Sequence, residues 1–212
     1  AVNSHDGWMS CHVNPLSLPA GSPMIEIIFF GRGGQGAVTA AQVLATAAFK
    51  EGKYAQAFPS FGPERRGAPV TAYARIDEDR ILVRSNIIKA DYVLVLDPNI
   101  FKTSNPLESV KAHGTAILNA GGAEVQIRDD EACKSVRVCR LDASRISEDV
   151  YGRRPIPMTN IAMLGAFAAV SKVVRLDSIV LAADGFFSAE QAEKAKKTAR
   201  VAFEEIEGAE SL

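Results

Sequence analysis

The sequence predicts an α/β protein, a three-layer α/β/α domain with a mixed, largely parallel sheet and a helical C-terminal part. Apolar runs of strand length, such as Ile25–Phe30 and Tyr92–Leu96, recur through the first two-thirds of the chain. A glycine-rich turn, Gly31–Gly36, joins the first run to a helical pattern. After residue 157 the pattern is helical to the end. These features together are typical of a sheet covered by helices.

The spacing of apolar residues predicts the individual elements. Helices are expected at about Gly36–Glu51, at Asn160–Val174 and at Ala189–Glu207. Strands are expected at Ile25–Phe30, Lys53–Phe58, Val70–Ile76, Ile81–Val83, Tyr92–Leu96, Thr115–Leu118, Glu124–Ile127 and Val136–Leu141. The polar residues 77–80 lie between two of these strands and predict a hairpin turn.

The last two predicted helices differ in their patterns. Asn160–Val174 is apolar nearly all round, so it is buried in the protein's own core or against a partner. One sheet face cannot readily cover that much apolar surface. We therefore expect the isolated chain to self-associate or to bury about 800 Å² or more on a partner. Ala189–Glu207 has a narrow alanine stripe among charged residues, which predicts a surface helix.

Composition and length set further limits. The 212 residues are 47% hydrophobic and 23% charged, which excludes collagen-like, disordered and low-complexity classes. We expect a single domain over residues 24–212; residues 1–23, rich in Ser, Pro, Gly and Asn, are expected to be a leader or a disordered extension. The net charge of −1 does not support a nucleic-acid or anionic-membrane partner. Three cysteines are too few for a disulfide scaffold and favour a reducing, cytoplasmic location.

The first candidate for chemistry is the turn Gly31-Arg32-Gly33-Gly34-Gln35-Gly36. It fits G-x-G-x-x-G between a strand and a helix, the arrangement of Rossmann-like domains. Such glycines let the backbone approach a diphosphate, while the helix N-terminus offers free amides. A dinucleotide site also needs an acidic residue after the second strand, and no carboxylate occurs there before Glu64. A nicotinamide cofactor is therefore disfavoured, and the glycines either approach another polyanion or only allow helix and strand to pack closely.

The second candidate is the loop of residues 59–69, which carries Arg65 and Arg66. Three prolines and two glycines make this loop stiff. Adjacent guanidinium groups suit a phosphate, a carboxylate or an acidic patch on a partner. A solvated or self-paired role fits the composition equally well.

The sequence contains no motif for a self-sufficient active site. It has no phosphate loop of the G-x-x-x-x-G-K-[ST] type, no H-E-x-x-H helix and no G-x-S-x-G elbow. Cys133 and Cys139 lack iron–sulfur spacing and are more typical of core residues. His113 is more typical of a structural loop histidine, and the first 23 residues offer His5, Cys11 and His12 without a fourth metal ligand. We therefore predict no catalytic residue and no metal site in this chain.

At its two loops the sequence resembles the gamma subunits of pyruvate:ferredoxin oxidoreductases, in the 2-oxoacid:acceptor oxidoreductase family. The resemblance spans Met24 to about Glu207 and is carried by five segments: GRGGQGAVTAA (31–41), YAQAFP (54–59), GPERRGAPV (62–70), ADYVLVLDP (90–98) and NIAMLGAF (160–167). The second loop is closer to the pyruvate type than to branched-chain 2-oxoacid types.

The resemblance implies a subunit that is inactive alone. Its complex would oxidatively decarboxylate pyruvate to acetyl-CoA and CO₂ and reduce ferredoxin, with thiamine diphosphate, Mg and iron–sulfur clusters on alpha, beta and delta subunits. Coenzyme A is the co-substrate, and the residues expected to help hold it are Gly31, Arg32, Gly33, Gly34, Gln35, Gly36, Arg65 and Arg66. Three alternatives stay open: a purely structural assembly subunit, a gamma subunit for another 2-oxoacid such as 2-oxoisovalerate, and an independent nucleotide-binding module.

Overall fold

The computed structural model of the protein describes residues 24–60, 69–120 and 135–210. Within these ranges the strands are β1 (Ile25–Arg32), β2 (Tyr54–Pro59), β3 (Pro69–Asp77), β4 (Ala90–Val95), β5 (Val110–Asn119) and β6 (Arg137–Leu141). The helices are α1 (Ala37–Lys50), α2 (Ala143–Tyr151), α3 (Asn160–Ser171), α4 (Leu176–Ala183) and α5 (Ala189–Glu210), with the 3₁₀ helices η1 (Pro98–Lys102) and η2 (Pro106–Ser109). The expected α/β class is confirmed.

The strands form one mixed sheet in the order β2-β3-β1-β4-β5-β6. Strands β1, β4, β5 and β6 are parallel neighbours, whereas β3 runs antiparallel to both β1 and β2. The carboxyl ends of the four parallel neighbours therefore meet at one edge of the sheet, which we call the carboxyl edge. We call the opposite edge, where these strands begin, the amino edge.

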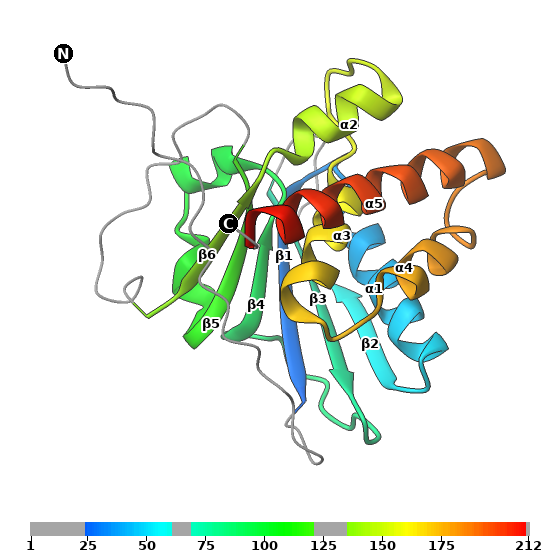
Figure 1. The fold of residues 1–212 in the computed structure, drawn as a ribbon. Helices are drawn as coiled ribbons and strands as arrows, with labels where there is room; N and C mark the ends of the chain where they lie inside the picture. The colour runs from blue at the N-terminus through cyan, green and yellow to red at the C-terminus, as the bar shows by residue number, and fades with distance from the viewer. Residues whose placement is uncertain (1–23, 61–68, 121–134, 211–212) are drawn as a thin grey trace.

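Side chains alternate along the strands between two apolar layers. In β1, Ile27 and Phe29 enter the larger layer, beneath α1, α3, α4 and α5, while Ile28 enters the smaller one. Figure 1 shows these helices gathered on one side of the sheet. In the described ranges, the smaller layer is closed by η2 through Leu107 and by the segment before β4 through Ile87, rather than by an α-helix.

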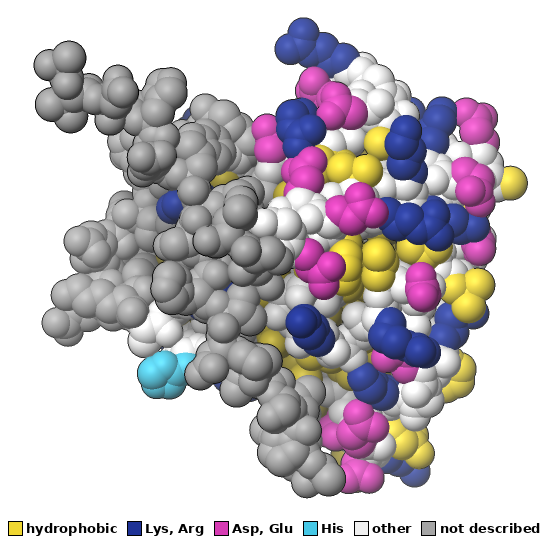
Figure 2. Space-filling model, viewed as in Figure 1, with side chains coloured by type: hydrophobic (Ala, Val, Ile, Leu, Met, Phe, Trp, Pro, Cys, Tyr) yellow, Lys and Arg dark blue, Asp and Glu magenta, His cyan; other side chains and the backbone are white. Residues whose placement is uncertain are grey.

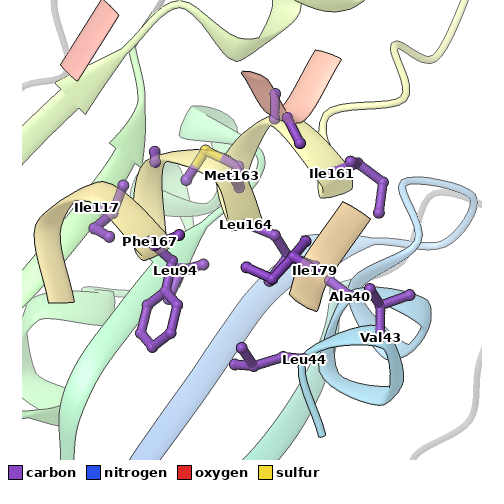
Figure 3. Close-up of a cluster of buried hydrophobic side chains, with 14 of the residues drawn as sticks. Ala40, Val43, Leu44, Leu94, Ile117, Ile161, Met163, Leu164, Phe167 and Ile179 are labelled. Atoms are coloured by element: carbon purple, nitrogen blue, oxygen red, sulfur yellow. The ribbon is translucent and has the colours of Figure 1, made fainter. Parts of the chain in front are cut away.

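Helix α3 is buried on all sides within this chain. Every residue from Asn160 to Val170 is buried, and Figure 3 shows Leu164 and Phe167 among side chains of α1, α4, β4 and β5. On its other side α5 comes so close that a Cβ on Gly165 would lie 2.2 Å from the carbonyl oxygen of Ala199. The chain thus covers α3 by itself. The reason given for expecting self-association, an apolar helix that needs a partner, is therefore wrong.

Helix α5 is the predicted surface helix, and this expectation is confirmed. Its buried side carries Ala192, Ala195, Thr198, Ala199, Ala202 and Ile206. Its outer side carries ion pairs such as Lys194 with Glu190 (2.8 Å). Figure 2 shows acidic and basic side chains interspersed over this face of the molecule. The small alanine side chains are what let α5 lie so close to α3.

The predicted hairpin at residues 77–80 is wrong. Residues 81–83 form no strand, and Leu82 is 75% exposed. The physical reason is that β3 already pairs with β1 on one side and β2 on the other, which leaves it no free edge. The segment instead touches β2, where Gln56 Nε2 donates to the carbonyl oxygen of Ile81 (3.2 Å).

Most other expectations match the structure to within a few residues. Strands β5 and β4 begin earlier than predicted, and α2 and α4 were not distinguished by the spacing. The predicted strand at Glu124–Ile127 lies outside the described residues. No helix in the described part of the chain is long and apolar enough to cross a membrane.

Candidate functional site

The glycine turn, residues 31–36, carries the chain from β1 into α1 at the carboxyl edge. Gly34 (φ 101°) and Gly36 (φ 78°) have left-handed backbone angles, which glycine adopts most readily. Gly36 directly precedes α1, whose first turn has no side-chain cap and no acidic residue. The uncapped N–H groups and the positive end of the helix dipole are suited to bind an anion.

Gln35 holds the turn against the end of β4. Its side chain is buried, and its Oε1 accepts a hydrogen bond from the backbone N–H of Arg32 (2.8 Å). Its Nε2 donates to Oδ2 of Asp97 (3.0 Å), and its backbone N–H donates to the carbonyl of Arg32 (3.0 Å). The protein therefore sets the shape of the turn itself, which lowers the entropic cost of binding a ligand there.

Arg32 supplies the positive charge of the turn. Its Nε lies 3.3 Å from Oδ2 of Asp97, and its side chain is 39% exposed. The other oxygen of Asp97 accepts from the backbone and side-chain N–H groups of Asn99 (2.8 and 2.9 Å). Within the described part of the chain the Nη groups of Arg32 make no hydrogen bond or ion pair, so they can donate to a phosphate or carboxylate.

A second helix begins beside the turn. A Cβ on Gly36 would lie 2.5 Å from Nδ2 of Asn160, the first residue of α3. Thr159 precedes it at the N-cap position, yet its hydroxyl makes no capping bond. Both residues are buried, but Oγ1 of Thr159 and Oδ1 of Asn160 have no hydrogen-bond partner. Buried polar atoms are nearly always paired, so this pair marks an unusual point in the structure.

The rest of the carboxyl edge is pinned by Asn119, at the end of β5. Its Nδ2 donates to the carbonyl oxygen of Leu96 (2.9 Å) and to Oγ of Ser144 (3.0 Å). Its Oδ1 accepts from the backbone N–H of Ser144, at the start of α2 (3.2 Å). The ends of β4 and β5 and the start of α2 are thus tied together around the turn.

The structure brings Gly31 to Gly36 together as one turn, whereas Arg65 and Arg66 lie outside the described residues. His113 is exposed, has φ 63°, and lies in the first half of β5, away from the carboxyl edge. Cys139 is buried in the larger apolar layer, as expected of a core residue. His5, Cys11, His12 and Cys133 lie outside the described residues.

The topology argues further against a nicotinamide dinucleotide. In a Rossmann domain the strand that follows the first helix supplies the carboxylate that holds the ribose. Here β3 lies between β1 and β2, so β2 is not the neighbour of the strand that carries the turn. Strand β2 ends at Phe58 and Pro59 without a carboxylate.

Sequence reasoning missed Asp97, Asn119, Thr159 and Asn160. The sequence does carry a signal for Asp97, because this residue follows a buried strand. Functional side chains gather at that position in α/β sheets. Thr159 and Asn160 had none, because threonine and asparagine before an apolar helix ordinarily indicate a cap.

In the described part of the chain, no group of three or more His, Cys, Asp or Glu side chains could hold a metal ion. The chemistry available at the carboxyl edge is instead hydrogen bonding to an anion. Backbone amides, the Arg32 guanidinium and the Asn160 carboxamide all offer N–H donors there.

The chain is similar in sequence and in structure to known proteins. The family model described as pyruvate ferredoxin/flavodoxin oxidoreductase matches residues 26–205. The chain is 46% identical to the pyruvate/ketoisovalerate oxidoreductases common subunit gamma of Pyrococcus abyssi, over 87% of this chain and 98% of the relative. It is 45% identical to the pyruvate synthase subunit PorC of Methanocaldococcus jannaschii, over 86% and 97%. The crystal structure of pyruvate oxidoreductase subunit PORC from Thermotoga maritima superposes with a TM-score of 0.68 at 30% identity, covering 85% of this chain and 96% of that one.

Proposed function

This chain belongs to the pyruvate ferredoxin/flavodoxin oxidoreductase family as a gamma-type subunit, and we propose that its glycine turn holds the phosphates of coenzyme A in the assembled enzyme. The complex would oxidatively decarboxylate pyruvate and transfer the acetyl group to coenzyme A, passing the electrons to ferredoxin. This chain would supply binding groups rather than redox chemistry.

The observation that carries the proposal is the uncapped start of α1 behind a braced turn. Gly36 precedes α1 without a capping side chain, and Gln35 and Asp97 hold the turn in place. Coenzyme A carries a diphosphate and a ribose phosphate, and its thiol must reach the acyl intermediate while these charges are held. A fixed set of N–H donors with Arg32 beside it suits a phosphate better than a neutral or cationic ligand.

Other subunits would supply the remaining parts of the reaction. We propose that alpha, beta and delta subunits carry thiamine diphosphate, Mg and the iron–sulfur clusters, and that ferredoxin docks on the complex. The gamma-type domain would comprise residues 24–212, since the family match begins at residue 26. The low cysteine count supports a reducing, cytoplasmic compartment.

The name of one relative bears on the choice of 2-oxoacid. The Pyrococcus abyssi protein is named as a subunit common to pyruvate and ketoisovalerate oxidoreductases. A subunit shared by two enzymes suits the step that both share, the use of coenzyme A, rather than recognition of the acid. We propose pyruvate as the substrate of the complex, with 2-oxoisovalerate as the alternative.

A purely structural role is the competing function, and the contact between Gly36 and Asn160 favours it. A side chain at residue 36 would collide with α3, so packing alone is a sufficient reason for a glycine there. On this view the turn only lets α1 and α3 begin side by side.

Steady-state kinetics of the assembled complex with coenzyme A varied tests the proposal. Arg32→Ala should raise the KM for coenzyme A about tenfold or more, because one charge-assisted hydrogen bond contributes about 1.5–3 kcal/mol. The matched control is Arg84→Ala, which removes an exposed arginine from the segment at the amino edge. An unchanged KM in the Arg32 variant, or an equal change in the Arg32 and Arg84 variants, would mean that the turn has only a structural role.

A further inference from the structure

Two neighbouring buried polar groups at the start of α3 have no hydrogen-bond partner, and one of them, the Asn160 carboxamide, lies against Gly36 of the glycine turn. Thr159 is 1% exposed and Asn160 is 3% exposed, yet Oγ1 of the first and Oδ1 of the second accept and donate nothing. Leaving such groups unpaired destabilises the folded chain. Their position beside the proposed binding turn, rather than elsewhere in the core, calls for an explanation.

The backbone around Thr159 explains why the protein does not satisfy its hydroxyl. An N-cap residue usually has extended backbone angles, which let its oxygen reach the next N–H groups. Thr159 instead has φ −82° and ψ −14°, which are helical angles, and no capping bond forms. The first turn of α3, like that of α1, therefore keeps N–H groups that no side chain caps.

The segment between α2 and α3 holds this helix start in place. Met158 N–H donates to Oγ of Ser147 in α2 (3.0 Å). Two residues earlier, the Cδ1 atom of Ile156 lies 3.3 Å from the point that a Cβ on Gly34 would occupy. The segment is thus fastened to α2 at one end and rests on the glycine turn at the other.

We propose that Thr159 and Asn160 are ligand-binding residues, so that the ligand is held between the N-termini of two helices, α1 and α3. The inference rests on the proposed function, because it takes the ligand to be coenzyme A. The Asn160 Nδ2 and Thr159 hydroxyl would donate to phosphate oxygens. The Asn160 Oδ1 can only accept, so it would take a hydroxyl or amide N–H of the same molecule, and coenzyme A carries both beside its phosphates.

A ligand-binding role makes a specific prediction about the empty chain. If the Thr159 hydroxyl serves the ligand, replacing it with a methyl group of similar volume removes an unpaired polar atom from the core. Thr159→Val should then keep or raise the melting temperature of the ligand-free chain while weakening binding of coenzyme A. A hydroxyl needed for a capping bond would lower the melting temperature when it is lost, and a side chain needed only for packing would leave the binding of coenzyme A unchanged.

The test combines two measurements on four variants. The full chain is melted without ligand, and the KM for coenzyme A is measured in the assembled complex with subunit stoichiometry checked. Thr159→Val is expected to raise the KM about fivefold or more and Asn160→Ala about tenfold, whereas Thr159→Ser restores the wild-type KM. The matched control is Thr198→Val, since Thr198 is fully buried but its hydroxyl donates to the carbonyl of Lys194 (2.8 Å). That variant should melt at a lower temperature with an unchanged KM.

The outcomes separate this inference from the proposed function. If Arg32→Ala raises the KM for coenzyme A but Thr159→Val and Asn160→Ala do not, the two α3 residues are structural and the inference is overturned while the function stands. If none of the three variants changes the KM, the inference and the proposed function are both overturned. A Thr159→Ser variant that behaves like Thr159→Val also overturns the inference, because the hydroxyl would then not matter.

Discussion

Both edges of the sheet are polar, but they differ in whether the protein itself pairs their polar groups. At the amino edge, charged side chains from β1, β3, β4 and β5 pair with one another. At the carboxyl edge, helix N-termini, Arg32 and the Thr159–Asn160 pair retain hydrogen-bonding capacity that the chain does not use. The polar groups of the amino edge are therefore paired within the protein, and the carboxyl edge is the one that we propose binds a ligand.

The amino edge shows what a satisfied charge cluster looks like in this protein. Glu26 pairs with Nε of Arg75 (3.1 Å) and with Nζ of Lys111 (3.2 Å), and Lys111 also pairs with Asp91 (2.9 Å). Arg75 is almost fully buried, and its Nη2 donates to the carbonyl of Ser85 (2.8 Å). Only its Nη1 lacks a partner. Two positive and two negative groups cancel, which leaves no net charge to attract a ligand.

The difference teaches that charge alone does not identify a site in this chain. The charge cluster at the amino edge contains four ionised groups, yet nearly all of their donors and acceptors are used within the protein. At the glycine turn the described residues form one ion pair, Arg32 with Asp97, and the capacity to bind comes mostly from uncharged amides. Variants at the two edges should therefore separate into those that change stability and those that change binding.

The largest effect is expected at the amino edge. Glu26→Gln leaves the buried Arg75 guanidinium without its carboxylate and should lower the free energy of unfolding by about 3 kcal/mol. Urea unfolding measures this. The control Glu190→Gln breaks a solvent-exposed pair on α5 and should leave the free energy of unfolding nearly unchanged. The KM for coenzyme A should not change. A loss as small as the control's would mean that the amino edge does not depend on this pair.

The second effect concerns the arginine loop. Arg65→Ala or Arg66→Ala should raise the KM for coenzyme A about tenfold to a hundredfold, because each loses charge-assisted hydrogen bonds of about 1.5–3 kcal/mol. Decarboxylation of pyruvate, which precedes the chemical role of coenzyme A, should be little changed. Steady-state kinetics with coenzyme A varied, on complexes whose subunit stoichiometry has been verified, measures this change. An unchanged KM together with a lost subunit would assign these arginines to assembly.

The third effect tests the brace of the carboxyl edge. Gln35→Ala removes the bonds to Arg32 and Asp97 and should lower the free energy of unfolding by about 1–2 kcal/mol. Because the turn is then less ordered, the KM for coenzyme A should rise several-fold as well. Gln42→Ala on the exposed side of α1 is the matched control for both measurements. If stability falls and the KM does not move, the turn's shape is not needed for binding.

The smallest effect is a pH dependence at the amino edge. Burial opposes the charge of Lys111, but hydrogen bonds and charge from Asp91 and Glu26 outweigh it and raise the pKa of this lysine above its ordinary value of 10.5. A raised pKa in the folded state means that the stabilisation is fully present below 10.5 and is lost as the pH rises through the folded value. Since Lys111 is 37% exposed, solvent screening keeps the effect small.

Thermal melts of wild type and Lys111→Met over about pH 8 to about pH 11 check this linkage. The two proteins should differ most at the lower end of that range and converge at the upper end. Parallel curves across the whole range would mean that the lysine's charge does not contribute to stability.

Much of this molecule could be predicted from local patterns. The apolar runs at β1 and β4, the helical periodicity of α1 and the glycine turn between β1 and α1 are all readable, because each depends on neighbours within a few residues. The all-round apolar pattern of α3 correctly predicts burial but cannot say what covers it. The false hairpin at residues 77–80 has the same origin, since β3 also pairs with β1, a strand far from it along the chain.

The sequence by itself determined the α/β class and the glycine turn, because hydrophobic periodicity and glycine conformation act locally, and five of its segments carry the resemblance to the family. Only the tertiary structure decided that Gln35 reaches Asp97 across 62 residues and that Gly36 meets Asn160. It also decided that β3 separates β1 from β2 and that the amino edge cancels its own charges. These contacts join positions far apart in the chain, and they form only when the sheet and its helices pack, so no local pattern can specify them.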